Sequence, residues 1–310
     1  MTAKTSIGAG LALALALSTI AVAQEIKLTL ADQNSGTAFG PTNAVKPWIA
    51  QVEKATNGRV KIELYSSQTL LKGIDTWKGV ASGIADMGWC VQNYWPDLTP
   101  LGEVITLPGL PFKSAEHGSE VAWKLYEKFP SIQKEYGEIQ PLVLYTASPN
   151  FLMTKKPVKT LDDMKGLKFR VGGFAGLILT RLGVVPQQIA GGDIYPALER
   201  GTIDAAEWVG PYDDEKLGFY KIAPHYYYPG WWEGSATLGL FVNLKALNAL
   251  PALYQTALRT ATASKANRSR TDTSAVLWLS PRVKTCITPP ASNRKFGSPA
   301  SEVRPWATWP

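Results

Sequence analysis

Apolar and polar residues alternate in two short segments near the start of the chain, residues 26–30 (IKLTL) and 60–64 (VKIEL). A period of two is typical of strands that bury one face. The segment between them, residues 41–58, has its apolar side chains at a helical spacing and ends in Gly58, which predicts a helix with a glycine directly after its C-cap. Strand, helix and strand in this order predict a βαβ unit and therefore a mainly parallel sheet.

A second pattern occurs twice further along, in residues 80–89 (VASGIADMGW) and 198–208 (LERGTIDAAEW). Each copy has the end of a helix, a glycine, an Asp three residues later and a short strand with a Trp. Open α/β sheets bind ligands at the carboxyl ends of their strands. The two copies therefore predict an α/β protein with two lobes and a ligand cleft between them, and 310 residues are enough for two such cores.

The first residues have the three parts of an export signal. Lys4 gives a positive start, residues 11–22 are apolar, and small residues at positions 21 and 23 precede Gln24. The apolar run is shorter than the ~20 residues that span a bilayer. We therefore expect residues 1–23 to be a signal peptide that is cleaved before Gln24, which predicts a periplasmic protein.

The end of the chain differs from the rest in charge. From residue 265 onward it has eight basic and two acidic side chains, whereas the preceding part has 24 and 23. The net charge of +7 therefore comes mainly from this end, and the nearly neutral body lacks the basic face that a nucleic-acid-binding domain needs. We expect no nucleic-acid partner, and we expect residues from about 268 to 310 to form an atypical basic tail that is loosely ordered.

Groups that would indicate catalysis are scarce. The two histidines, His117 and His225, stand in no nucleophile or zinc pattern, and the chain has neither a P-loop nor a dinucleotide fingerprint. Two cysteines, Cys90 and Cys286, define no disulfide framework, so we expect an independent buried thiol at Cys90. An enzyme is therefore not the favoured interpretation.

Arg170 is the first candidate for ligand binding. It lies at the end of a predicted strand, residues 167–171, that is followed by glycine and a helix. Its planar guanidinium can pair with both oxygens of a carboxylate. The residue pattern alone favours a solvated arginine at a strand end, so the carboxylate role depends on further observations.

Two glutamates raise a question of charge. Glu207 follows a predicted strand, and Glu233 ends an aromatic segment that begins at residue 226. If both face the cleft, each repels an anionic ligand by about 4 kcal/mol at about 4 Å and an effective dielectric constant near 20. Arg170 can neutralise one charge, and a cation with hard oxygen ligands, Na⁺ or Ca²⁺, would neutralise another. The alternative is that the glutamates face solvent or form ion pairs between the lobes.

The segment 191–234, together with GLKFR at residues 166–170, resembles the solute-binding proteins of TRAP transporters (tripartite ATP-independent periplasmic carriers). The similarity is greatest to the branch that binds 2-oxo monocarboxylates, and it runs from about residue 25 to about residue 264. It implies the two-lobed periplasmic binding protein fold (class II-like, TRAP substrate-binding type). It also implies transport without enzymatic activity.

The resemblance gives roles to individual residues. It implies that Arg170 holds the ligand carboxylate, that Trp208 and Glu233 contact the ligand, and that Glu207, Glu233 and the main chain of Trp208 hold a metal ion, with Na⁺ favoured over Ca²⁺. Asn150 stands where the family has a further polar ligand contact, although the 2-oxo acid binders usually have Gln there. A turn cap is the alternative for Asn150.

The resemblance also implies lobe boundaries and partners. Lobe I would comprise residues 24–147 plus about 235–250, and lobe II residues 148–234 plus about 251–267. The partners would be a small carboxylate ligand, the TRAP membrane subunits and a second copy of the chain, although the altered tail weakens the expectation of a homodimer. The alternative functions are a binding protein for lactate or a dicarboxylate that serves an ABC importer or a sensor, and a periplasmic enzyme.

Overall fold

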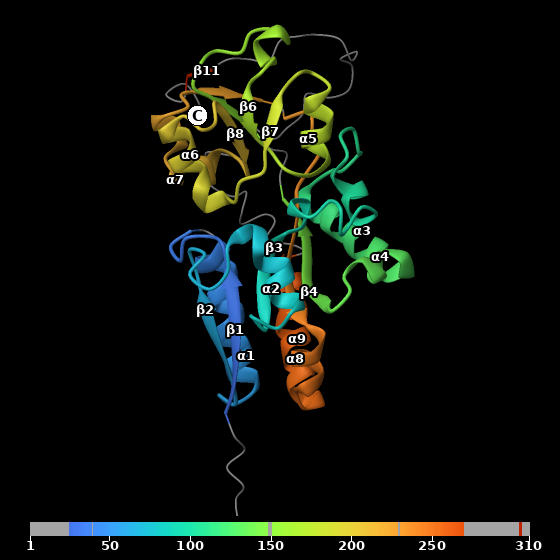
Figure 1. Cartoon of the computed structure of the whole chain (residues 1–310). Coiled ribbons are helices and arrows are strands. Elements are labelled where there is room, and N and C mark those ends of the chain that lie inside the picture. The colour runs from blue at the N-terminus through green and yellow to red at the C-terminus, as the bar shows by residue number, and fades with distance from the viewer. Residues whose placement is uncertain (1–24, 39, 148–150, 229, 270–303, 306–310) are drawn as a thin grey trace, which may run out of the picture.

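A computed structural model describes residues 25–38, 40–147, 151–228, 230–269 and 304–305. Figure 1 shows two α/β lobes, each built on its own sheet, as the repeated sequence pattern predicts. The expected signal peptide, Asn150 and Cys286 lie outside the described residues. So does the expected tail, apart from residues 268–269 and 304–305.

The first lobe has a five-stranded sheet in the order β2-β1-β3-β10-β4. Its strands are β1 (Ile26–Asp32), β2 (Val60–Tyr65), β3 (Met87–Val91), β4 (Ile139–Thr146) and β10 (Thr237–Asn243). β1 runs parallel to β2 and β3, whereas β10 is antiparallel to β3 and β4. The predicted βαβ unit is confirmed, because helix α1 (Lys46–Ala55) connects the parallel strands β1 and β2.

The helix of this unit ends slightly earlier than the sequence predicts. α1 has its C-cap at Thr56, so that Asn57 and not Gly58 is the first residue beyond the cap. Both residues have positive φ angles, 49° and 73°. The amide of Gly58 donates to the carbonyl of Glu53 (2.7 Å), and that of Asn57 to the carbonyl of Lys54 (3.2 Å). This is the Schellman arrangement, in which the glycine occupies the second position after the cap.

Helices surround the first sheet, and its core includes fully buried Leu30, Val52 and Met87. The further helical segments of this lobe are η1 (Pro41–Val45), η2 (Gly73–Asp75), α2 (Thr76–Ala81), η3 (Gln92–Tyr94), η4 (Gly102–Thr106), α3 (Ala115–Lys128), α4 (Pro130–Glu135), α8 (Leu244–Ala249) and α9 (Ala252–Ser269). η3 follows β3 directly, so its residues lie at the carboxyl end of that strand. This end points toward the second lobe (Figure 1).

The second lobe has a six-stranded sheet in the order β11-β9-β5-β8-β6-β7. Its strands are β5 (Phe151–Thr154), β6 (Lys168–Arg170), β7 (Val185–Gln187), β8 (Ala205–Trp208), β9 (His225–Tyr227) and β11 (Arg304–Pro305). Its helical segments are η5 (Asp162–Met164), α5 (Gly173–Thr180), η6 (Gly191–Asp193), α6 (Ile194–Arg200), α7 (Pro211–Lys216) and η7 (Phe219–Lys221). Because β11 pairs with β9, residues 304–305 of the expected tail extend this sheet.

The last helix differs from its expected place. We expected residues 251–267 to accompany the second lobe, but α9 packs against α1 and β4 of the first. Leu258 and Ala261 belong to the hydrophobic core of the first lobe. The physical reason is the short connection: β10 returns the chain to the first sheet, α8 begins at once with Asn243 as its N-cap, and α9 follows beside it.

Candidate ligand site between the lobes

A cavity lies where the two lobes meet, and its empty volume, counting the open mouth, is ≈ 400 Å³. Lobe I and its returning strand line it with Val91, Asn93, Tyr94, Ala236 and Leu238. Lobe II lines it with Arg170, Gly172, Glu207, Trp208, Val209 and Glu233. Small-molecule sites usually lie in such concave positions between domains. A few polar groups in a partly apolar wall are also usual there.

Arg170 is the last residue of β6, and only 3% of it is exposed. Its Nε donates to the carbonyl of Ile189 (2.8 Å), and its Nη1 donates to the carbonyl of Glu207 (3.1 Å). Nη1 also donates to Oε1 of Glu207, which makes a buried ion pair. Burial acts to lower the pKa of Arg170, but Tyr94, Glu207 and Glu233 act against it and raise that pKa. The guanidinium is therefore charged.

The register of the second sheet explains why Trp208 lies beside this arginine. Arg170 on β6 pairs with Ala206 on β8, and alternate side chains of a strand share a face. The side chain two residues after Ala206 therefore lies on the face of Arg170, and the Trp208 ring centroid is 5.1 Å from its guanidinium carbon. A Cβ at Gly191 would lie 2.3 Å from this ring. Glycine is therefore needed at that position to make room for the indole.

Glu233 is held by a residue of the first lobe. Asn93 donates from Nδ2 to Glu233 Oε1, while its Oδ1 accepts a hydrogen bond from the backbone amide of Thr237 (2.9 Å). Because a backbone amide can only donate, this contact fixes the orientation of the Asn93 side chain. The Nδ2 group then has to face the glutamate.

Tyr94 connects the first lobe to Arg170. Its hydroxyl accepts a hydrogen bond from Arg170 Nη2 (2.9 Å) and donates to Gln33 Oε1 (3.3 Å). The carbonyl of Tyr94 accepts a hydrogen bond from Gln188 Nε2 of the second lobe. Burial raises the pKa of Tyr94, although the charge of Arg170 acts to lower it, so the hydroxyl is neutral.

Our sequence-based prediction did not include Asn93 and Tyr94. Their position contained a usable signal, because they follow the first copy of the repeated pattern, at the carboxyl end of its strand. The site residues that the sequence predicts, as far as the structure describes them, come together around one cavity: Arg170, Glu207, Trp208 and Glu233. The side chain of Asn150 lies outside the described residues.

The residues that line the cavity fit a bound cation. Glu207 and Glu233 are 3% and 4% exposed and offer hard carboxylate oxygens. Counted as carboxylates beside the Arg170 guanidinium, they give the lining a formal net charge of −1, and an anionic ligand adds to it. Among the described residues, no group of three or more His, Cys, Asp or Glu side chains could hold a metal. A cation here would therefore need main-chain, amide or ligand oxygens as well.

The aromatic segment before Glu233 contributes side chains to the hydrophobic core of the second lobe. Trp232 packs edge-on against Phe169, with ring centroids 5.7 Å apart. Tyr226 donates from its hydroxyl to Asp214 (2.6 Å). Neither Trp232 nor Tyr226 lines the cavity between the lobes.

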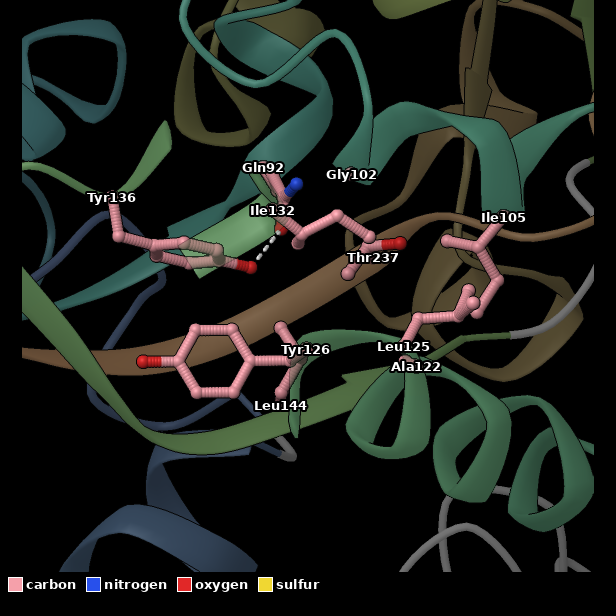
Figure 2. A pocket seen from close by; sticks show the side chains of 10 residues that line it. All are labelled: Gln92, Gly102, Ile105, Ala122, Leu125, Tyr126, Ile132, Tyr136, Leu144 and Thr237. Carbon is pink, nitrogen blue, oxygen red and sulfur yellow. Dashed lines mark hydrogen bonds between the residues drawn. The ribbon is translucent and has the colours of Figure 1, made fainter. Parts of the chain in front are cut away.

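A second cavity lies within the first lobe, with an empty volume of ≈ 250 Å³ including its opening (Figure 2). Its walls are mainly apolar side chains of α3, α4 and neighbouring segments, such as Ile105 and Leu125. The polar side chains that it contains belong to Gln92, Thr237 and tyrosines, and Tyr136 donates to Gln92 Oε1 (3.0 Å). No side chain in its lining carries a charge that would hold a carboxylate.

The thiol of Cys90 is unreactive because it is buried. Cys90 is a free, buried thiol, as expected, and burial raises its pKa well above the ordinary value. No helix in the described part of the chain is long and apolar enough to cross a membrane.

The chain is similar to known solute-binding proteins. A monocarboxylate 2-oxoacid-binding periplasmic protein from Nostoc sp. is 41% identical over 232 residues, which are 73% of this chain and 62% of the Nostoc protein. A solved TRAP periplasmic solute-binding protein from Pseudoalteromonas atlantica, with bound sodium and pyruvate, has a TM-score of 0.67 at 30% identity. The match covers 82% of this chain and 78% of that chain.

A TRAP solute-binding protein from Bordetella bronchiseptica has a TM-score of 0.64 at 31% identity, with 80% of this chain and 75% of that chain covered. Its crystal contains a mixed-occupancy dimer with calcium and picolinate in one active site. These likenesses confirm the two-lobed fold that the sequence predicts. The model of the family described as bacterial extracellular solute-binding protein, family 7, matches residues 38–275. The chain belongs to this family of solute-binding proteins.

Proposed function

We propose that this protein captures a small 2-oxo monocarboxylate, such as pyruvate, in the periplasm and delivers it to the membrane subunits of a TRAP transporter. The observation that carries the proposal is the cavity between the lobes, in which one buried guanidinium and two buried glutamates share an otherwise neutral wall. The similarity to the Nostoc and Pseudoalteromonas proteins supports this ligand class and this transporter type.

Arg170 is the proposed partner of the ligand carboxylate. A guanidinium has five N–H donors, and the hydrogen bonds to Ile189, Glu207 and Tyr94 use four of them. The ligand carboxylate would bind the remaining Nη2 donor and share the guanidinium with Glu207. One guanidinium matches one carboxylate, which favours a monocarboxylate over a dicarboxylate.

Glu207, Glu233 and the main-chain carbonyl of Trp208 are the proposed metal ligands, and Asn150 would contact the ligand or the metal. A cation of this kind neutralises charge and offers a common partner to the carboxylate and keto oxygens of a 2-oxo acid. Na⁺ is our first choice and Ca²⁺ the second, and the relatives from Pseudoalteromonas and Bordetella contain these ions. Acids without an oxygen at the second carbon would lose one of these contacts and bind more weakly.

A calorimetric panel tests the ligand class. Pyruvate, 2-oxobutyrate and longer 2-oxo acids should bind more tightly than lactate, and C4 dicarboxylates should bind weakest. The matched comparison is pyruvate with propionate, since they differ at the second carbon only. Equal binding of the two, or tightest binding of a dicarboxylate, would contradict the proposed ligand class.

A further inference from the structure

Glu103 is a buried acid outside the ligand cavity that the proposed function does not use. It lies on η4 of the first lobe and is 0% exposed. Its Oε1 has no hydrogen-bond partner among the described residues, and its Oε2 accepts a hydrogen bond from Thr106 Oγ1 at 3.5 Å. An ionised carboxylate in such surroundings is costly, because little replaces its lost hydration.

This carboxyl lies against the second lobe, at the start of α5. A Cβ at Gly173, the first residue of that helix, would lie 2.9 Å from Glu103 Oε2. Gly173 has a φ of +58°, and α5 has no side-chain cap at its N-terminus. Glycine therefore allows the carboxyl of one lobe to approach the helix start of the other.

The same short helix η4 contacts two of the segments that carry charged residues of the site, those of Arg170 and Glu233. Gly173 stands three residues after Arg170. On the other side, the amide of Gly234, which follows Glu233, donates to the carbonyl of Thr106 on η4 (3.1 Å). A change at η4 can therefore reach Arg170 and Glu233 without any direct contact with the ligand.

The buried position of Glu103 favours its protonated form. Burial, with a smaller contribution from Glu135, raises its pKa to about 8, although the hydrogen bond from Thr106 acts to lower it. Besides Glu135 on α4, Tyr136 after α4 interacts electrostatically with Glu103. Figure 2 shows Tyr136 at the cavity that Gly102, the neighbour of Glu103 in the chain, also lines. α5 and β10 carry no titratable side chain.

We propose that Glu103 is a positioning residue whose neutral carboxyl completes the contact between the lobes, so that ligand capture is accompanied by the uptake of a proton at Glu103. The inference rests on the proposed function, because it assumes that the lobes close around a ligand. When the lobes separate, water reaches the carboxyl and it ionises. When they close, it takes up one proton from solvent and becomes a buried neutral acid beside Gly173.

Calorimetry of pyruvate binding in two buffers with different heats of ionisation measures this proton. At pH 7 the wild type should take up close to one proton. Its affinity should fall about tenfold between pH 7 and pH 9, because the bound form then loses a proton that the free form never had. The Glu103→Gln variant, which keeps a neutral side chain of the same shape, should lack both effects, whereas Glu127→Gln on the exposed face of α3 should behave like the wild type.

Absence of proton uptake by the wild type, or equal uptake by Glu103→Gln, would overturn the inference while leaving the ligand class intact. Failure of the wild type to bind pyruvate at any pH would instead contradict the proposed function. Urea unfolding in saturating pyruvate then decides the state of Glu103 in the closed form: the pyruvate-bound wild type should lose stability from pH 7 to pH 9 relative to pyruvate-bound Glu103→Gln, because the closed form gives up its extra proton as pH rises through about 8. An equal pH dependence in the two proteins would overturn the inference.

Discussion

Around the shared cavity the second lobe contributes the charged side chains Arg170, Glu207 and Glu233, whereas the first lobe contributes the neutral Asn93 and Tyr94. The neutral pair holds two of the charged groups in place: Asn93 bonds to Glu233 and Tyr94 to Arg170. Each lobe alone is therefore incomplete. From this difference we propose that the second lobe determines the charge of the ligand, while the first determines how its partners are oriented.

The largest expected effect on ligand binding comes from removing the positive charge that the second lobe contributes through Arg170. Arg170→Ala should weaken pyruvate binding by about 2–5 kcal/mol, or from tens-fold to thousands-fold, because a charge-assisted pair in a closed cavity is lost. Arg170→Lys should recover only part of this, since an ammonium group has three N–H donors and cannot replace the four hydrogen bonds of Arg170 while also binding the ligand. Calorimetry is the measurement, with the exposed Arg181→Ala as control. A folded Arg170→Ala protein that binds within threefold of the wild type would contradict the role of Arg170.

The glutamates should give the next largest effect. Glu207→Gln and Glu233→Gln each keep the size of the side chain but remove a charge that we assign to cation binding. We expect each change to weaken pyruvate binding at least about tenfold and to reduce its dependence on added cation, as seen in titrations at several cation concentrations. The exposed Glu199→Gln is the matched control. Unchanged cation dependence in both variants would show that the glutamates serve only in ion pairs and hydrogen bonds.

Tyr94→Phe tests the neutral side of the comparison. The variant loses the hydroxyl that accepts a hydrogen bond from Arg170 and donates to Gln33. A hydrogen bond to a charged group contributes about 1.5–3 kcal/mol, so we expect a loss of about tenfold in affinity with little change in ligand preference. The partly exposed Tyr220→Phe should have no effect. A change in the ranking of ligands would mean that the first lobe also selects the ligand.

The last prediction concerns the stability of the fold and not ligand binding, and it involves another buried acid of the first lobe. Burial raises the pKa of Asp32 to about 6, although hydrogen bonds from Asn34 act to lower it. A raised pKa means that the folded protein binds this proton more tightly, so stability is greatest at low pH and falls as pH rises from about 4 to 6. A shift of about two units corresponds to about 3 kcal/mol. Urea unfolding between pH 4 and pH 7 should show a steeper loss for the wild type than for Asp32→Asn, and parallel curves would contradict this.

Much of the fold could be predicted because its signals are local. The period of two in residues 26–30 and 60–64 depends only on neighbouring residues, and so does the helical spacing between them. The structure has β1, α1 and β2 in these segments. The place of α9 could not be predicted in this way, because its packing on α1 and β4 depends on where β10 returns. Periodicity shows that a segment is helical but not which lobe it covers.

The same distinction applies to the site. Arg170 and Glu207 stand at strand ends in recognisable segments, so both could be identified as candidates from the sequence. Their ion pair with each other depends on the pairing of β6 with β8, which no local pattern contains. Asn93 and Tyr94 were missed for a similar reason: their importance comes from bonds to residues 140 and 76 positions away.

The most direct test of the account is the dependence of pyruvate binding on a cation. Counted as carboxylates, the two glutamates of the cavity exceed the Arg170 guanidinium by one negative charge before any anion enters, and we propose that a second negative charge needs a cation beside it. Wild-type protein dialysed free of Na⁺ and divalent ions, with choline as the replacement cation, should bind pyruvate at least about tenfold more weakly. Added Na⁺ or Ca²⁺ should restore the affinity. Equal affinity with and without the cation would contradict the account, because Arg170 alone would then suffice to hold the ligand.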